Sequence, residues 1–148
     1  MTTISTMVTF PGKTEEAFNF YKSVFGTEFN GQIMRWSDMP AQPGSPALSD
    51  EDKKRIMHVE LPISEGYTIM GADETSVAPS GAPKTTYGNN IVICLGPDTR
   101  AESDRLFTGL SAGGKVTMPM TDMFWGDYYG EFTDKFGVRW MINCATKK

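Results

Sequence analysis

The sequence predicts an α+β fold in which a β-α-β-β-β module occurs twice and the strands form a cup-shaped mixed sheet. Two segments have helical periodicity, and each follows one short apolar run and precedes three more strand-like runs. A stretch rich in Ser, Gly and Pro, residues 76–84, separates the two copies. We therefore expect a single domain over residues 1–148, made of modules at about 1–75 and 86–148.

The first module begins with a β-branched and apolar run at residues 4–10, which predicts a strand. A helix is expected from Thr14, whose hydroxyl can cap the free amides of the first turn. Apolar residues recur at helical spacing until Gly26, which is expected to end the helix. Three further strands are expected in this module, at residues 27–37, 56–63 and 67–72.

Residues 38–53 join two of these strands and contain prolines, a glycine and several acids. A segment of this composition and length is expected to be a surface loop, long enough to act as a lid or as an arm in a dimer. The second module repeats the order, with a strand at 90–95 and a helix at 99–110. The last three strands are expected at residues 115–118, 124–133 and 138–144.

Composition and charge limit the classes of function. The chain has 148 residues, of which 39% are hydrophobic and 22% charged, as in a globular protein with a core. Its formal net charge of −4 argues against a nucleic-acid partner, which would favour a basic surface. No apolar run approaches the roughly 20 residues of a membrane span, and the first residues do not resemble a secretory signal. We therefore expect a soluble, cytoplasmic protein with no membrane partner.

Both cysteines, Cys94 and Cys144, lie in apolar runs. They are expected to be buried free thiols in a reducing compartment. Alternation along the strands places them on opposite faces, an arrangement that disfavours a disulfide between them.

Several stretches of the sequence resemble a known family. Met7–Phe10 and Ala17–Gly26 are similar to the first strand and helix of the vicinal oxygen chelate superfamily, which includes glyoxalase I, extradiol dioxygenases, and fosfomycin and bleomycin resistance proteins. Ile56–Leu61, Ile69–Asp73 and Phe124–Trp140 are similar to its PhnB-like branch, often labelled demethylubiquinone methyltransferase-like. The sequence gives the methyltransferase label no support, because no glycine-rich cofactor loop follows a strand.

The resemblance implies a divalent metal inside the cup, held by one His or Glu from each of four strands. The corresponding positions of this sequence are Met7, Met70, Asn90 and Met141. Thioethers suit Cu(I) rather than hard or borderline dications, and a neutral amide is a weak donor. A copper site is one interpretation. We favour the other, in which methionine fills the space of an absent metal because it packs irregular gaps well, and we expect no metal or other cofactor.

Alternation along the strands also predicts which side chains face the cup. The residues expected there are His58, Glu60, Asn90, Trp125, Tyr129, Arg139 and Asn143. Aromatic walls with a few polar groups are typical of small-molecule pockets. Other interpretations stay open, because His58 could make a structural hydrogen bond and Arg139 could pair with Asp134 or Glu131. The aromatic residues could equally pack in the core or at an interface.

Two functions fit these residues. The first is a metal-free protein that binds a small hydrophobic or aromatic molecule, as antibiotic-binding members of the superfamily do. The second is an enzyme of isomerase, lyase or dioxygenase type, with His58 as general base oriented by Glu60, or with an atypical metal site at that pair. We favour the first function. The resemblance also implies a homodimer, with the modules paired within one chain or between two.

Overall fold

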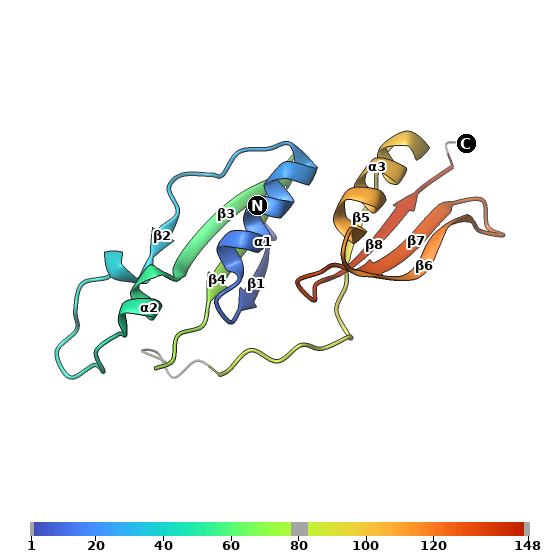
Figure 1. The fold of residues 1–148 in the computed structure, drawn as a ribbon. Coiled ribbons are helices and arrows are strands. Elements are labelled where there is room, and N and C mark those ends of the chain that lie inside the picture. The colour runs from blue at the N-terminus through green and yellow to red at the C-terminus, as the bar shows by residue number, and fades with distance from the viewer. Residues whose placement is uncertain (1, 78–82, 147–148) are drawn as a thin grey trace. The chain divides into compact units, whose positions relative to one another are not determined.

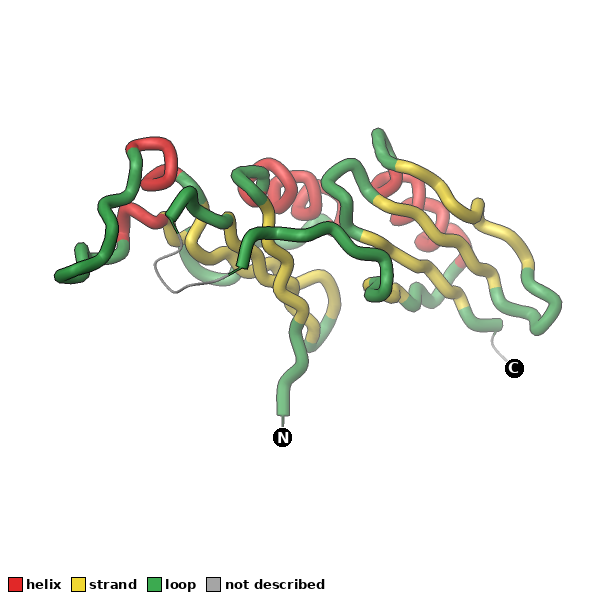
Figure 2. The backbone as a smooth tube through the Cα atoms, turned by 90° about the horizontal axis from the view of Figure 1, so that it is seen from below, coloured by secondary structure: helices red, strands yellow, loops and turns green. Residues whose placement is uncertain are grey.

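The computed structural model describes residues 2–77 and 83–146, so part of the predicted linker, residues 78–82, lies outside the described residues. The chain forms two compact units, Met1–Thr86 and Tyr87–Lys148, which are called unit 1 and unit 2 below. In each unit a four-stranded sheet carries its long helix on one face (Figure 1, Figure 2).

The elements of each unit follow in the order strand, helix and three strands, with two short helices added in unit 1. Unit 1 contains β1 (Thr6–Phe10), α1 (Thr14–Phe25), β2 (Met34–Arg35), the 3-10 helix η1 (Trp36–Asp38), α2 (Asp50–Lys54), β3 (Ile56–Ser64) and β4 (Tyr67–Asp73). Unit 2 contains β5 (Ile93–Leu95), α3 (Arg100–Ser111), β6 (Lys115–Asp122), β7 (Tyr128–Thr133) and β8 (Arg139–Cys144).

The two sheets have the same topology. Their strand orders are β1-β4-β3-β2 and β5-β8-β7-β6. In each sheet the first strand of the chain lies parallel to the last one, and the remaining pairs are antiparallel. Two mixed sheets with helices packed on them confirm the predicted α+β class.

The core of unit 1 forms where α1 packs against β3 and β4. The apolar face of the helix contributes Ala17, Phe18 and Tyr21, which are all completely buried. Gly71 of β4 lies beneath Phe18, and a Cβ at this position would overlap the aromatic ring. The helix can therefore approach the sheet closely because this position lacks a side chain. Gly26 ends α1 with a φ of 68°, as predicted.

The first turn of α1 is fixed by Asp73, which is buried at the end of β4. Its Oδ1 accepts hydrogen bonds from the backbone N–H of Gly12 (3.1 Å) and of Thr14 (3.0 Å), and from the Thr14 hydroxyl (2.7 Å). Its Oδ2 accepts from the N–H of Ile56 (2.9 Å). The prediction that Thr14 caps the helix is therefore wrong, because its hydroxyl donates to the carboxylate that serves the free amides of this turn.

The core of unit 2 forms where α3 packs against β6, β7 and β8. Leu106 and Leu110 of the helix are buried with Phe132, Trp140 and Ile142 of the sheet. This places the apolar residues of β8 on the helix side, as predicted.

Two polar residues fix the ends of elements in unit 2. Thr99 lies just before α3, and its side chain accepts a hydrogen bond from the N–H of Glu102 (3.2 Å), so the predicted helix start is confirmed. Asp134 is buried in the β7–β8 turn and accepts from the N–H of Val138 (3.0 Å) and the indole N–H of Trp140 (2.8 Å). The turn is thereby tied to the core beneath α3.

The structure corrects the bounds of two predicted strands. The strand expected at 27–37 is reduced to the two residues of β2, because Gly31 has a φ of 77°, which interrupts the extended backbone. The strand expected at 124–133 begins only at Tyr128, because a turn precedes it.

The edge strand β6 is longer than predicted and runs through the loop expected at 119–122. It contains Pro119, and its pairing with β7 shifts register between Val116 and Met118 and again between Met118 and Thr121. These irregularities explain why a short apolar pattern underestimated its length. At the other edge of the same sheet, β5 is shorter than the strand expected at 90–95.

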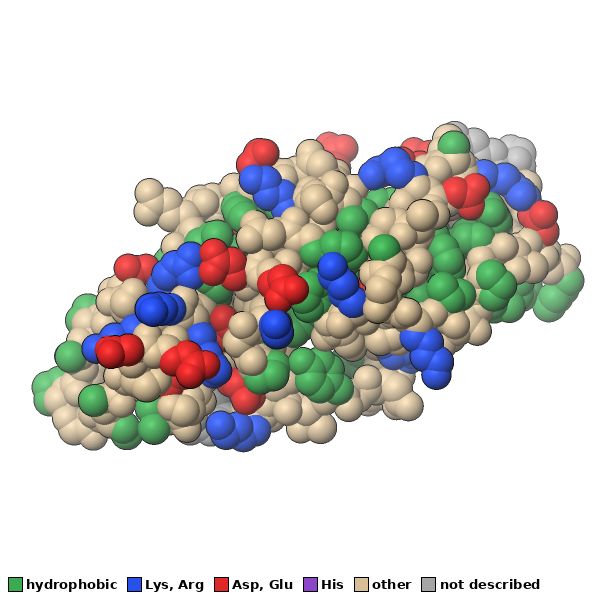
Figure 3. Space-filling model, viewed as in Figure 1, with side chains coloured by type: hydrophobic (Ala, Val, Ile, Leu, Met, Phe, Trp, Pro, Cys, Tyr) green, Lys and Arg blue, Asp and Glu red, His purple; other side chains and the backbone are tan. Residues whose placement is uncertain are grey.

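The segment 38–53, expected to be a loop, includes the end of η1 and most of α2. Asp52 of α2 is buried and accepts a hydrogen bond from the N–H of Ser76 (3.0 Å), so α2 is held to the segment that follows β4. Acidic and basic side chains alternate over the surface of α1 and α2 in Figure 3. Ion pairs such as Arg35 with Glu15 (2.9 Å) account for this pattern.

Cys144 is buried and Cys94 is exposed, and both are free thiols. The prediction of burial is therefore wrong for Cys94, which lies between Ile93 and Leu95 and points away from the core that holds Ile93. No helix in the described parts of the chain combines the length and apolar character needed to cross a membrane.

Candidate ligand-binding site

His58 and Glu60 lie side by side on β3, where they alternate with the buried residues Val59 and Leu61. The imidazole Nε2 is 2.9 Å from Oε1 of Glu60, and each of the two side chains is 32% exposed. The amide of Asn30 donates to Oε2 of Glu60 at 2.9 Å. The hydrogen bonds from His58 and then from Asn30 lower the pKa of Glu60, so the carboxylate stays charged and orients the imidazole.

A row of three residues crosses this face of unit 1. Met70 of β4 has Met7 of β1 in register on one side and Glu60 of β3 on the other. Residues in register on neighbouring strands point to the same side of a sheet. Two of the four expected metal positions are thus adjacent, and both carry thioethers.

A corresponding row crosses the face of unit 2 that lies opposite α3. Met141 of β8 has Cys94 of β5 in register on one side and Glu131 of β7 on the other. Each unit therefore carries two sulfur-containing side chains followed by a glutamate. Asn90, the remaining expected metal position, is exposed and precedes β5, so the β5 residue in register with Met141 is Cys94 instead.

The side chains in these rows do not fit the divalent metal that the resemblance implies. The methionines offer thioether sulfur, a soft donor, whereas hard and borderline dications prefer carboxylate and imidazole ligands. The glutamate of each row, with Cys94 in unit 2, supplies fewer than the three or so protein ligands that hold a dication well. Among the described residues, no group of three or more His, Cys, Asp or Glu side chains is arranged to hold a metal ion.

Aromatic side chains lie beside the unit 2 row. Trp125 and Tyr129 form an edge-to-face pair with ring centroids 6.4 Å apart, and Trp125 is 51% exposed. Tyr129 is in register with Asn143 and shares its face with Glu131 two residues further along β7. Burial, followed by the negative charge of Glu131, raises the pKa of Tyr129. The phenol is therefore protonated at neutral pH and can donate a hydrogen bond.

Arg139 and Asn143 lie at opposite ends of β8 on the same face. Arg139 donates through Nη1 to the carbonyl of Asn89, and its Nη2 is 3.8 Å from Oε1 of Glu131. The interpretation that Arg139 pairs with Glu131 is thereby confirmed. Asn143 donates to the carboxylate of Asp127 at 3.0 Å, and this bond lowers the pKa of Asp127.

The structure brings the predicted site residues together in two groups, His58 with Glu60 in unit 1, and Trp125, Tyr129, Arg139 and Asn143 in unit 2. Asn90 belongs to neither, because it lies before β5, and its role in binding stays a prediction. Sequence reasoning missed Asn30 and Glu131 as members of these faces. Alternation from Tyr129 could have found Glu131, whereas nothing in the sequence pattern marks Asn30.

The chain belongs to the Glyoxalase/Bleomycin resistance protein/Dioxygenase superfamily, whose sequence pattern matches residues 3–142. This match and the two mixed sheets confirm the family resemblance noted from the strand and helix motifs.

Individual relatives match this chain over nearly its whole length. The chain is 32% identical to protein YjdN of Escherichia coli (strain K12) over 150 residues, which cover 98% of this chain and 97% of that protein. The crystal structure of protein PA1353 from Pseudomonas aeruginosa has 32% identity, a TM-score of 0.79, and coverage of 99% and 100% of the two chains. The PhnB protein from Bacillus cereus has 26% identity, a TM-score of 0.73, and coverage of 97% and 100%.

Proposed function

We propose that the chain binds a small molecule without using a metal, on the face of unit 2 formed by β5, β8 and β7. The row of Cys94, Met141 and Glu131 carries this proposal. Met141, at the centre of the face, offers soft thioether sulfur where the resemblance implies a metal ligand, and the Cys94 thiol lies beside it. A face of this kind suits contact with an apolar ligand better than coordination of a dication.

The surroundings of the row supply the parts of a small-molecule site. Trp125 offers an apolar ring face that is half exposed, and covering it with a ligand is worth on the order of 1–3 kcal/mol. Tyr129 offers a protonated phenol, whose hydrogen bond to a ligand is worth about 1 kcal/mol. Aromatic walls with few polar groups are typical of sites for small molecules.

Matched substitutions on β7 test the proposal. A compound that raises the melting temperature of the metal-stripped chain should bind Tyr129→Ala roughly tenfold more weakly in a calorimetric titration. Tyr128→Ala is the control, because its phenol points to the other side and donates to Asp104 at 2.7 Å. Equal weakening by both variants would show that the face containing Tyr129 is scaffold.

The absence of a required metal is tested by elemental analysis of the purified chain. We expect no stoichiometric Ni, Zn, Mn or Fe, because Met141 is a poor ligand for these ions and the row otherwise offers only Cys94 and Glu131. About one such ion per chain, lost in Met141→Ala or Met70→Ala, would contradict the proposal.

An enzymatic function is the second candidate, favoured by the His58–Glu60 pair in unit 1. A carboxylate that is itself fixed by Asn30 orients the imidazole at 2.9 Å, as a general base requires. If a screen of isomerase, lyase and dioxygenase reactions finds activity, His58→Gln should abolish it and Glu60→Gln should reduce it less. Activity that survives His58→Gln would exclude this role.

We also propose that the chain forms a homodimer. Large apolar side chains are exposed in both units, among them Met7, Met34, Ile91, Val116 and Phe124. A second chain would remove part of this apolar surface from water, and this gain supports the proposal. Light scattering should give about twice the chain mass of 16.4 kDa, and a particle of one chain mass at micromolar concentration would contradict the dimer.

A further inference from the structure

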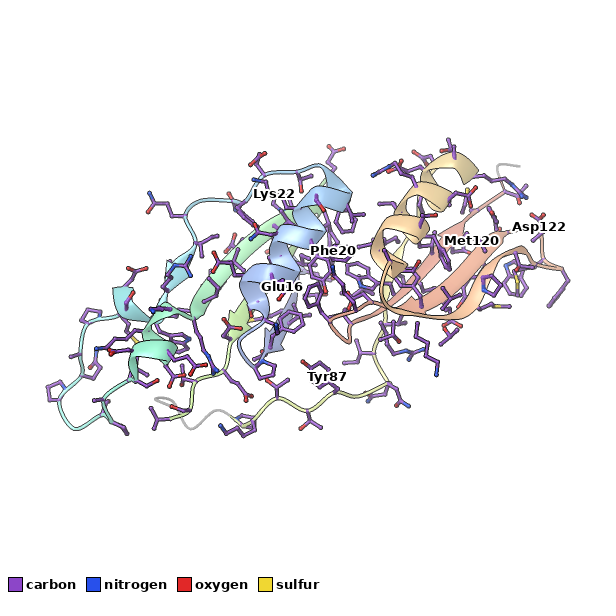
Figure 4. All side chains as sticks on the ribbon, in the orientation of Figure 1. Glu16, Phe20, Lys22, Tyr87, Met120 and Asp122 are labelled. Atoms are coloured by element: carbon purple, nitrogen blue, oxygen red, sulfur yellow. The ribbon has the colours of Figure 1, made fainter. Side chains whose placement is uncertain are left out.

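A pocket of about 490 Å³ opens at the end of the unit 2 sheet where β7 turns into β8. Its wall includes Lys115 of β6, Thr133 of β7 and Arg139 of β8. Tyr87 and Asn89, from the segment that leads to β5, complete it (Figure 4 labels Tyr87). A volume of this size accommodates a small organic molecule or one end of a larger one.

The three strand residues of this wall form a single row. Thr133 is in register with Lys115 on one side and with Arg139 on the other, so two cationic side chains flank a hydroxyl on one face of the sheet. Thr117 adds a second hydroxyl to the wall. None of the residues that line the pocket, all within the described part of the chain, is acidic.

The charges of the row do not cancel. Glu131 lies 3.8 Å from Arg139 and compensates its charge in part, whereas Lys115 forms no ion pair with any described residue. Arg139 is held by the carbonyl of Asn89, so its position over the pocket is fixed before a ligand arrives. A guanidinium carries five N–H donors in a planar fork that matches the oxygens of a carboxylate or phosphoryl group.

We propose that this pocket binds an oxyanion, a carboxylate or a phosphoryl group, and that the ligand of unit 2 is therefore an apolar molecule with one acidic end. The inference rests on the binding surface proposed above on β5, β8 and β7, which is called the ligand face below. Its row of Cys94, Met141 and Glu131 is the next row along the same face of the sheet. Arg139 and Met141 are two residues apart on β8, which corresponds to about 7 Å. A group the size of a benzene ring attached to the acid would reach Met141 of that row.

The experiment uses the full chain and simple probes, at constant ionic strength so that screening does not vary. Amide signals are followed by NMR during titration with inorganic phosphate, with benzoate, with phenyl phosphate and with the neutral isostere benzamide. Phosphate and benzoate should shift the signals of Thr117 and Thr133, and benzoate should bind at least tenfold more tightly than benzamide. The ratio of the benzoate and phenyl phosphate affinities then identifies which acid the pocket prefers.

Three variants and one control locate the effect. Arg139→Gln and Lys115→Gln should each weaken benzoate binding at least fivefold, and Arg139→Lys should restore part of the loss in the first. Arg105→Gln is the matched control, because this arginine lies on α3 and pairs with Glu102 at 2.7 Å. If Arg139→Gln fails to fold, Lys115→Gln decides the question, since its side chain holds no described partner in place.

The outcomes separate this inference from the proposed function. Equal affinity for benzoate and benzamide, or equal weakening by Arg105→Gln, would overturn the oxyanion pocket and leave the ligand face standing. Shifts at Thr117 and Thr133 with phosphate, but none at Tyr129 with any apolar compound, would support the pocket and overturn the ligand face. Unmoved signals at Thr117 and Thr133 with phosphate and benzoate at tens of millimolar would exclude the pocket.

Discussion

In unit 1 the first turn of α1 depends on Asp73, which lies 59 residues after Thr14 in the sequence. In unit 2 the first turn of α3 is capped by Thr99, the residue directly before the helix. The two sheets have the same strand order. The polar group that serves the helix nevertheless comes from the neighbouring strand β4 in unit 1 and from the helix's own start in unit 2.

The difference shows where each unit is vulnerable. A local cap serves one amide and is worth about 1 kcal/mol, so its loss leaves the rest of the unit intact. The carboxylate of Asp73 accepts from Gly12, Thr14 and Ile56, so it joins the start of α1 to β3 and β4. Its loss would leave several buried donors without an acceptor in one step.

The largest expected effect belongs to Asp73→Ala. This change should lower the free energy of unfolding by at least about 3 kcal/mol, because buried N–H groups lose their acceptor. Chemical denaturation followed by circular dichroism measures the loss, and hydrogen exchange should show the amides of α1 opening before those of α3. Asp73→Asn keeps one acceptor oxygen and should cost less. A loss no larger than that of Thr99→Ala would remove the contrast between the units.

Substitutions of the two glycines beneath the helices should come next. Gly71→Ala would place a methyl group inside the ring of Phe18, which is completely buried, at a cost of about 2–3 kcal/mol. Gly130→Ala would bring Cβ to 2.7 Å from the sulfur of Met120 and 2.8 Å from the ring of Phe107. Neither side chain is completely buried, so both can shift and the cost should be lower than at Gly71. Denaturation midpoints compare the two, and a larger loss for Gly130→Ala would reverse the order.

Thr99→Ala should destabilise unit 2 by about 1 kcal/mol, because Glu102 loses its side-chain acceptor. Thr99→Ser retains the oxygen and is expected to stay near the parent stability. Denaturation with the same buffer and probe as for Asp73→Ala makes the comparison direct. Equal stability of Thr99→Ala and the parent chain would show that the local cap contributes nothing.

The smallest effect concerns Glu131, the glutamate of the unit 2 row. Glu131→Gln should lower the pKa of Tyr129 toward its ordinary value, because the carboxylate charge is the second cause of the increase after burial. Arg139→Gln should raise it further, since the guanidinium acts in the opposite direction. Ultraviolet absorbance during a pH titration measures both shifts, provided that the chain stays folded.

The sign of the effect of Tyr129 on stability follows from its raised pKa. The native state holds this proton more tightly than the unfolded state, so the contribution is present below the ordinary tyrosine pKa of about 10 and is lost as the pH rises above it. In Glu131→Gln the loss should begin at the same pH but end nearer to that ordinary value, so the total loss should be smaller. Identical alkaline denaturation profiles of parent and variant would contradict the coupling.

The sequence predicted the helices and most of the sheet residues because their patterns are local. The periodic apolar residues and Gly26 locate α1, and Thr99 locates α3. Alternation placed His58 and Glu60 on one face of β3, where the structure finds them in contact. These features depend on spacing within a single segment.

Features that depend on a distant partner could not be predicted in the same way. The edge strands β2 and β5 contain two and three residues, and their bounds are set by the neighbouring strand rather than by their own pattern. Asp73 replaced the expected cap at Thr14 because it reaches the helix from another strand. The sequence did not show that Cys94 rather than Asn90 lies beside Met141, since this depends on the register of β5 with β8.

The irregular course of β6 has a consequence for how molecules of this protein meet. An edge strand presents unpaired backbone N–H and C=O groups, with which a strand of another molecule can pair. β6 is such an edge strand and has eight residues. Pro119 lacks the N–H that such a ladder needs, and the two register shifts break the even spacing of its remaining donors and acceptors. A continuous sheet extended through this edge would be poorly bonded, so β6 protects the native protein against edge-to-edge polymerisation.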